Sequence, residues 1–167
     1  MSIFALQLAK ARGARVIITS SSDDKLDRAR ALGADDTVNY RARPDWDAAV
    51  RSLTGGTGAD LVVDSAGGAE FGRSLRALRY GGLLYALGFV GGTATELDLL
   101  ELNSNGLRIQ GTNGASAAEL AATMAAIAAH RLRPVVDRSF GLEKLAEAYR
   151  FVRGGGHLGK VAVTLDW

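Results

Sequence analysis

The chain has 167 residues, about the size of one domain, and its 47% hydrophobic and 23% charged residues are typical of a folded globular protein. Its 20 basic and 18 acidic residues leave a net charge of only +2, with the arginines scattered, so we expect no nucleic-acid partner. The absence of cysteine excludes disulfides and cysteine-ligated zinc, and it favours a reducing, cytoplasmic location. No secretory signal is visible, and the most apolar stretch, residues 117–129, is shorter than the roughly 20 residues that cross a bilayer. We therefore expect no membrane association.

Helical and strand-like patterns alternate along the first half of the chain, where one-sided apolar faces are followed by short β-branched runs. Ser22 or Asp23 is expected to cap the second helix, and Asp45 the third. The expected elements are a helix over 2–12, a strand over 15–19, a helix over 22–32, a strand over 37–40 and a helix over 46–53.

The same alternation continues in the second half. Gly81 and Gly82 are expected to end a helix, and Ser116 with Glu119 forms a capping box that opens an alanine-rich one. The expected elements are a strand over 59–65, a helix over 69–79, strands over 83–87 and 107–111, helices over 116–130 and 142–152, and a strand over 160–165. Strands that alternate with helices in this way predict an α/β fold, doubly wound around a mostly parallel sheet.

The chain opens on a helix rather than on a strand. In doubly wound nucleotide-binding folds, the first strand, a Gly-rich turn and the next helix together grip a pyrophosphate. The one literal G-x-G-x-x-G match, residues 154–159, has a helix before it and a strand after it, the reverse of that order, so it is interpreted as a helix-to-strand turn. Ser65 lacks a nucleophile-elbow motif, the adjacent aspartates lie near helix starts or turns, and two histidines cannot form a metal cluster. No catalytic or metal-binding residue is predicted.

Six segments carry a resemblance that extends over essentially the whole chain: ALQLAKARGARVIITSSSDDKLDRARALGADDTVNY, LVVDSAGG, GGLLYALGFVGG, LRIQGTNGAS, AAHRLRPVVDRSF and GGHLGKVAVTL. In this order they resemble the cofactor domain of the medium-chain dehydrogenase/reductase superfamily, the group of zinc alcohol dehydrogenases and quinone oxidoreductases. The resemblance implies a Rossmann-like sheet that lacks its first strand and Gly-rich turn. Residues 1–167 would then be a single dinucleotide-binding domain, truncated at its N-terminus. In this family a separate N-terminal domain supplies the catalytic zinc and most substrate contacts, so the resemblance implies no zinc in this chain.

The resemblance also implies a cofactor site. Ser20 stands where NAD-preferring relatives carry an acidic residue, and Ser21 and Lys25 are placed to donate to a 2′-phosphate, which favours NADP while NAD stays possible. Tyr40 resembles a tyrosine that approaches the same phosphate. The remaining implied positions are Ser65, Ala66 and Gly67 along the adenosine, Gly88, Phe89, Thr112 and Asn113 beside the nicotinamide, and Lys160 near the pyrophosphate.

These observations support two main functions. The first is the NADP-binding domain of an oxidoreductase that transfers hydride between nicotinamide and an alcohol, carbonyl, quinone or activated alkene, without activity of its own. The second is a non-catalytic module that folds by oligomerising or strand exchange and binds no cofactor tightly. In the family's sheet order the missing strand lies between the strands 15–19 and 60–65, so we expect their edges to pair directly or to borrow a strand from another chain or copy. A homo-oligomer is therefore expected. A regulatory nucleotide sensor is a third possibility, by analogy of fold only.

Overall fold

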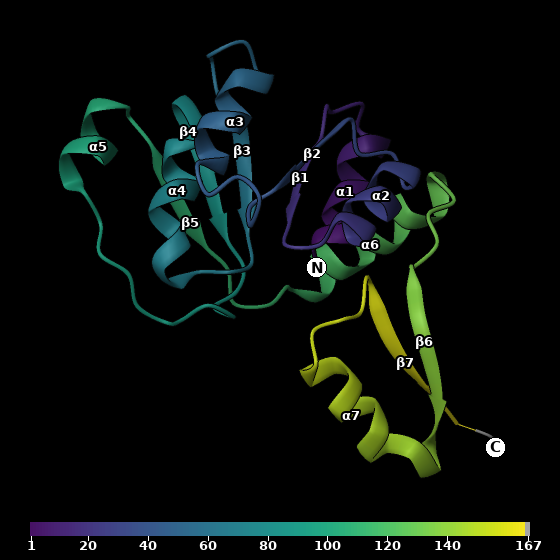
Figure 1. Cartoon of the computed structure of the whole chain (residues 1–167). Helices are drawn as coiled ribbons and strands as arrows, with labels where there is room; N and C mark the ends of the chain where they lie inside the picture. The colour runs from purple at the N-terminus through teal and green to yellow at the C-terminus, as the bar shows by residue number, and fades with distance from the viewer. Residues whose placement is uncertain (166–167) are drawn as a thin grey trace.

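The computed structural model describes residues 1–165, in which helices and parallel strands alternate (Figure 1). The helices are α1 (Ser2–Ala11), α2 (Asp23–Ala31), α3 (Trp46–Leu53), α4 (Phe71–Arg76), α5 (Leu99–Ser104), α6 (Ala117–Ala129) and α7 (Leu145–Arg153), with short 3-10 turns η1 (Gly68–Glu70) and η2 (Leu142–Lys144) before α4 and α7. The strands are β1 (Ile17–Ser20), β2 (Asp36–Asn39), β3 (Ala59–Asp64), β4 (Leu78–Ala86), β5 (Arg108–Gly111), β6 (Val136–Gly141) and β7 (Lys160–Thr164).

The strands form three sheets in which every neighbouring pair is parallel. β1 pairs with β2, β3 to β5 form a second sheet in the order β3-β4-β5, and β6 pairs with β7. The mixed α/β class with parallel sheets is thus confirmed. No helix in the described part of the chain is long and apolar enough to cross a membrane.

Three apolar clusters connect the elements. The first joins α1 to α2 and to Leu158, which precedes β7. The second is built on α3 and contacts β1 through Ile17 and β3 through Val62. The third joins α4 to β3 and β4 around Leu84, whose side chain is fully buried. Burial of these side chains is the main favourable contribution to folding.

No strand of residues 1–165 lies between β1 and β3, so each of these two strands keeps one unpaired edge. Direct pairing of the two edges, one of the two outcomes expected from the sequence, therefore does not occur within the chain. Ile17 of β1 and Val62 of β3 nevertheless pack against the same cluster on α3. Through this cluster α3 contacts both sheets.

Residues 77–82 fold differently from the prediction made from the sequence. The helix expected over 69–79 ends at Arg76, and the strand expected over 83–87 begins at Leu78, so Gly81 and Gly82 lie inside β4 and do not end a helix. In the register with β3, Leu78 pairs with Ala59 and Leu83 with Leu61, which makes residues 79–82 a bulge opposite residue 60. The bulge contains Gly81 at φ +68°, a conformation that costs glycine little.

Helix α5 and strand β6 are not predicted from the sequence. Helix α5 has six residues, none of them buried, and so offers no one-sided apolar face. Strand β6 belongs to a small C-terminal sheet that α7 covers, and this sheet is tied to α2 by the Arg28–Asp137 ion pair of 2.7 Å. Helix caps are predicted better. The Ser22 hydroxyl accepts the Lys25 amide and the Ser116–Glu119 capping box forms, although Asp45 makes no side-chain cap hydrogen bond.

Candidate functional site

The residues implied in cofactor binding lie where strands end. β1 ends at Ser20, β2 at Asn39, β3 at Asp64, β4 at Ala86 and β5 at Gly111. Because neighbouring strands are parallel, the loops that follow them emerge at the same edge of each sheet, the edge at which doubly wound folds bind ligands. Residues 20–21 and 40 follow the first sheet, and residues 65–67, 88–89 and 112–113 follow the second.

A chain of hydrogen bonds shapes the turn after β1. The Ser20 hydroxyl accepts the Ser22 amide at 3.4 Å, and the Ser22 hydroxyl accepts the Lys25 amide at 3.4 Å. The Tyr40 amide donates to the Ser20 carbonyl at 3.0 Å, which places Tyr40 beside this turn with its side chain 42% exposed. The structure therefore brings Ser20, Lys25 and Tyr40 together at one end of the β1–β2 sheet.

The Lys25 ammonium group has a partner from the C-terminal part of the chain. Its Nζ donates to the carbonyl oxygen of Gly155 at 2.5 Å, in the loop between α7 and β7. This loop is the G-x-G-x-x-G stretch, and its position between a helix and a strand confirms that it is a helix-to-strand turn. Lys25 is partly buried there, on the side of α2 that faces the C-terminal sheet.

The loops after β3 and β4 pack directly against each other. The Gly91 amide donates to the Ala66 carbonyl at 2.7 Å, and Gly67 and Gly92 form an isolated β-bridge. A Cβ atom on Gly67 would lie 2.9 Å from the Gly92 oxygen, and one on Gly88 would lie 2.7 Å from the Ser65 oxygen. Any side chain at Gly67 or Gly88 would therefore force the two loops apart.

Asp64, a residue that the sequence analysis does not propose, anchors the first of these loops. Its side chain is 5% exposed, and its Oδ1 accepts the amides of Ala66 and Gly67, each at 2.8 Å. Its Oδ2 accepts the hydroxyl of Ser74 on α4 at 2.6 Å. An aspartate directly after the apolar run Leu61–Val63 and before Ser-Ala-Gly-Gly is the signal that points to it.

The other implied residues lie apart from these contacts. Thr112 and Asn113 are exposed just after β5, and the Thr112 hydroxyl contacts the Gly114 carbonyl at 3.4 Å. Lys160 begins β7, and its Nζ lies 5.8 Å from the Phe4 ring centroid in α1. Burial, together with the positive charge of Lys160, lowers the pKa of the Met1 amino group. Lys160 is thus close to the N-terminus of α1, the end that favours anions.

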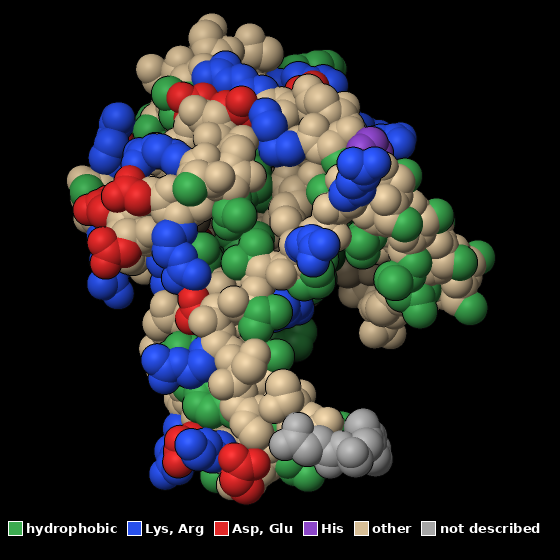
Figure 2. Space-filling model, turned by 90° about the vertical axis from the view of Figure 1, so that its right-hand side faces the viewer, with side chains coloured by type: hydrophobic (Ala, Val, Ile, Leu, Met, Phe, Trp, Pro, Cys, Tyr) green, Lys and Arg blue, Asp and Glu red, His purple; other side chains and the backbone are tan. Residues whose placement is uncertain are grey.

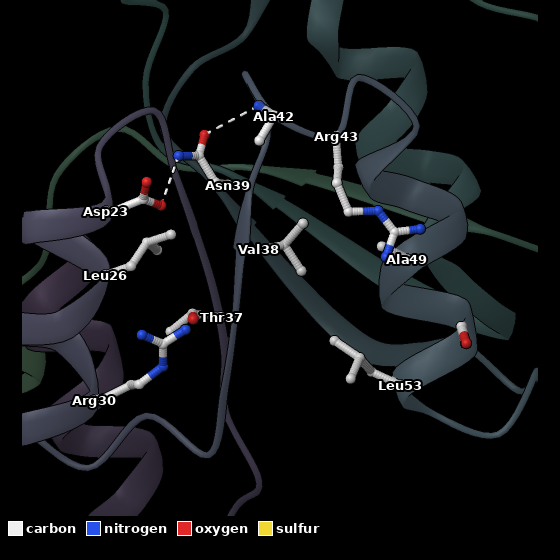
Figure 3. A pocket seen from close by; sticks show the side chains of 11 residues that line it. Asp23, Leu26, Arg30, Thr37, Val38, Asn39, Ala42, Arg43, Ala49 and Leu53 are labelled. Carbon is white, nitrogen blue, oxygen red and sulfur yellow. Dashed lines mark hydrogen bonds between the residues drawn. The ribbon is translucent and has the colours of Figure 1, made fainter.

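A cavity of about 360 Å³ lies along the outer edge of β2, between α2 and α3 (Figure 3). Its polar rim includes Asp23, whose carboxylate accepts the Asn39 side-chain amide at 2.8 Å, and Arg30, which pairs with Asp27. None of the residues implied in cofactor binding lines it. Within residues 1–165, no three His, Asp or Glu side chains come together in a group that could hold a metal ion.

Comparisons with known proteins agree with this arrangement. A family model described as zinc-binding dehydrogenase matches residues 1–129. A zinc-type alcohol dehydrogenase-like protein of Schizosaccharomyces pombe is 36% identical over 171 residues, which are 99% of this chain and 49% of that protein.

Solved structures give the same result. The crystal structure of an NAD-dependent alcohol dehydrogenase matches with a TM-score of 0.91 and 41% identity, over 99% of this chain and 48% of its own. The structure of a mycobacterial protein complexed with NADPH matches with a TM-score of 0.82 and 26% identity, over 98% of this chain and 54% of its own. The chain spans about half the length of these relatives. Its sequence and its fold place it in the zinc-binding dehydrogenase family, within the medium-chain dehydrogenase/reductase superfamily.

Proposed function

We propose that residues 1–167 form the NADP-binding domain of a medium-chain oxidoreductase. The whole enzyme transfers hydride between nicotinamide and an alcohol, carbonyl, quinone or activated alkene, and the chain alone does not complete that reaction. The observation that carries the proposal is the set of Gly-lined loops at the carboxyl ends of β3 and β4, pressed together so closely that a Cβ would separate them. In doubly wound folds, dinucleotides bind in the crevice outside the carboxyl ends of the strands, where these loops lie. The match to a structure complexed with NADPH supports the same ligand class.

The residues present fit such a cofactor. Ser20, Ser21, Lys25 and Tyr40 supply hydroxyl and ammonium groups toward the ribose phosphate. The loops 65–67 and 88–89 supply a wall of small residues, with Phe89 as its one large side chain. Thr112 and Asn113 stand on the nicotinamide side and Lys160 near the pyrophosphate. The nicotinamide itself supplies the hydride chemistry, and the chain binds and orients it. No residue of this chain is proposed as catalytic.

NADP is favoured over NAD because the end of β1 carries a hydroxyl instead of a carboxylate. Ser20 does not repel a 2′-phosphate, and the Lys25 ammonium lies one turn into the following helix. Lys25 then exchanges its contact with the Gly155 carbonyl for one with the phosphate, a charge-assisted hydrogen bond that is stronger than a neutral one.

The test is a fluorescence or thermal-shift titration of the chain with NADPH and NADH. We expect NADPH to bind more tightly, and Lys25→Ala to reduce the preference about tenfold, since a hydrogen bond between charged groups is worth about 1.5–3 kcal/mol. Arg28→Ala is the matched control, because it also releases the C-terminal sheet from α2 but leaves Lys25 in place. An unchanged preference in Lys25→Ala, or an equal loss in Arg28→Ala, contradicts the assignment.

A second function has its own support. The unpaired edges of β1 and β3, and large apolar side chains such as Val90 (94% exposed) and Leu100 (76%), suit a module that self-associates and binds no cofactor tightly. Figure 2 shows hydrophobic side chains at the surface of the face that it displays. This function predicts that the measured molecular mass increases with protein concentration and that millimolar NADPH or NADH does not stabilise the chain. The first function predicts stabilisation by NADPH. Under either function we propose a cytoplasmic homo-oligomer.

A further inference from the structure

Asp64 is a buried carboxylate whose negative charge is met only by neutral donors. It accepts two backbone amides and one hydroxyl, and within residues 1–165 it forms no ion pair with Lys, Arg or His. Burying a charge is costly unless hydrogen bonds compensate for it, so the three short bonds to Ala66, Gly67 and Ser74 must offset that cost. The carboxylate is thus held in one place by two elements, the 65–67 loop and α4.

The same bonds fix the shape of the 65–67 loop. Both oxygens of the side chain are engaged, and the Asp64 carbonyl also accepts the Leu87 amide at 2.7 Å, which links the end of β3 to the end of β4. The Ala66 carbonyl in this loop also accepts a hydrogen bond from the Gly91 amide. The hydrogen bonds of Asp64, one of them from Ser74, therefore determine the conformation of the loop. They also determine how closely Gly67 approaches Gly92.

These contacts also decide what the loop can bind. Successive backbone amides commonly form a concave site for anions. Here the amides of Ala66 and Gly67 already point at the carboxylate of Asp64, so they are not free for a phosphate. The buried negative charge behind them further disfavours a second anion.

We infer that Asp64 and Ser74 are positioning residues: they hold the 65–67 loop, which the resemblance places along the adenosine, in its binding shape, and they engage its Ala66 and Gly67 amides so that these do not hold a phosphate. The inference rests on the proposed function. The phosphates of the cofactor then depend on groups outside this loop, such as the ammonium groups of Lys25 and Lys160.

The first experiment measures the dissociation constant for NADPH in the full chain and in two variants. Asp64→Asn replaces an acceptor oxygen with a donor, and Ser74→Ala removes one bond to the carboxylate. We expect Asp64→Asn to weaken binding about tenfold and Ser74→Ala about threefold, because one lost charge-assisted hydrogen bond corresponds to roughly a tenfold change. Asp60→Asn is the matched control, since Asp60 lies at the other end of the same strand with an 83% exposed side chain, and binding should not change.

A second readout separates positioning from a general loss of stability. Amide hydrogen exchange at Ala66 and Gly67 should accelerate in both variants, at temperatures well below their unfolding transitions, and stay unchanged in Asp60→Asn. Adenosine and inorganic pyrophosphate serve as probes of the two halves of the site. In Asp64→Asn, adenosine should lose affinity by the same factor as NADPH, whereas pyrophosphate should lose none.

The outcomes are distinct. A wild-type chain that binds neither NADPH nor NADH overturns the proposed function and this inference with it. If the wild type binds NADPH and both variants bind it equally well, only the inference is overturned, and Asp64 is structural. If Asp64→Asn loses affinity for pyrophosphate by the same factor as for adenosine, the loop is a phosphate site and the inference is overturned. If Asp64→Asn does not fold, Ser74→Ala decides, because it leaves the carboxylate and both loop amides in place.

Discussion

Two arginine side chains converge on the buried carboxylate of Asp47 and join α3 to α4. Arg73 Nη1 lies 3.0 Å from Oδ1 and Arg76 Nε 2.8 Å from Oδ2, and the Asp47 side chain is only 11% exposed. Burial alone raises the pKa of Asp47, but the hydrogen bonds from Arg76 and Arg73 outweigh it, so the pKa lies below its ordinary value. A carboxyl group with a lowered pKa in the folded state stabilises the protein above the unfolded pKa of about 3.9, and this contribution is lost as the pH falls through the lower, folded value.

We therefore predict that Asp47→Asn destabilises the fold by about 2 kcal/mol at pH 7, in the range of hydrogen bonds between charged groups after allowance for the half-exposed arginines. Below pH 4 the difference between variant and wild type should shrink, because the Asp47 carboxyl of the unfolded chain binds a proton first and that of the folded protein does so only at lower pH. Urea unfolding from pH 7 to pH 2.5 measures both effects. Asp45→Asn is the control, since Asp45 is 64% exposed and lies 3.7 Å from Arg43. A difference that is constant over this pH range contradicts the prediction.

The β4 bulge sets two neighbouring glycines under different constraints. Gly81 has a positive φ but open space around it, with the Arg79 side chain 3.6 Å from an added Cβ. Gly82 has no such φ, but an added Cβ would lie 2.9 Å from the Arg79 carbonyl oxygen and 3.0 Å from the Leu78 side chain. Alanine at 81 should cost about 1 kcal/mol from backbone strain. Alanine at 82 should cost more, about 2–3 kcal/mol, because it overfills a buried contact.

Denaturant midpoints of Gly81→Ala, Gly82→Ala and Gly111→Ala provide the comparison. Gly111 is the reference because nothing lies within 4 Å of its added Cβ and its φ is not positive, so alanine there should have little effect. From the most to the least stable, the order of the variants should be Gly111→Ala, Gly81→Ala and Gly82→Ala. An equal cost at positions 81 and 82 would show that the bulge relaxes around the new methyl group.

The elements that the sequence predicts well are those whose burial is one-sided or complete. The capped helix α2 is an example, since it buries Leu26 and Ala29 on one side and its local pattern and tertiary packing agree. The sequence misses elements that depend on distant partners. β4 continues through Gly81 and Gly82 because β3 pairs with it on both sides of the bulge, and no local signal records that register. β6 carries Asp137 and Arg138, which are accommodated only because Arg28 and the Phe151 ring lie opposite them.

The residues of the candidate site also divide into those that the sequence identifies and those whose roles depend on distant partners. A resemblance over the whole chain names residues such as Ser20 and Tyr40, which do meet at a strand end. It does not reveal that the Lys25 ammonium binds the Gly155 carbonyl, a contact that joins residues 130 positions apart. Nor does it reveal the role of Asp64, whose partners are a loop and the hydroxyl of Ser74 on the following helix. Side-chain contacts across elements follow from packing, which the chain order alone does not specify.

At the scale of the whole molecule, the two sheets that carry the site are joined by α3 rather than by backbone pairing. Among the described residues, no strand pairs with the second edge of β1 or of β3, and Leu61 of β3 remains 50% exposed. Unpaired edges of parallel strands are prone to pair with another chain, and a parallel strand inserted between β1 and β3 would satisfy both at once. Within residues 1–165 the two edges do not pair with each other, so the expectation that remains is a strand supplied from outside these residues, such as one from another copy or another chain.

We predict that the edges of β1 and β3 become protected when the protein self-associates. Amide hydrogen exchange of peptides covering residues 15–20 and 59–64, followed by mass spectrometry at several protein concentrations, tests this directly. Peptides covering 83–86 are the internal reference, because β4 is paired on both sides. At low concentration the two edges should exchange faster than β4, and at concentrations where light scattering shows an oligomer they should slow together. Exchange that stays fast in the oligomer means that association uses another surface. Slow exchange in a monomer means that the edges close within one chain in solution.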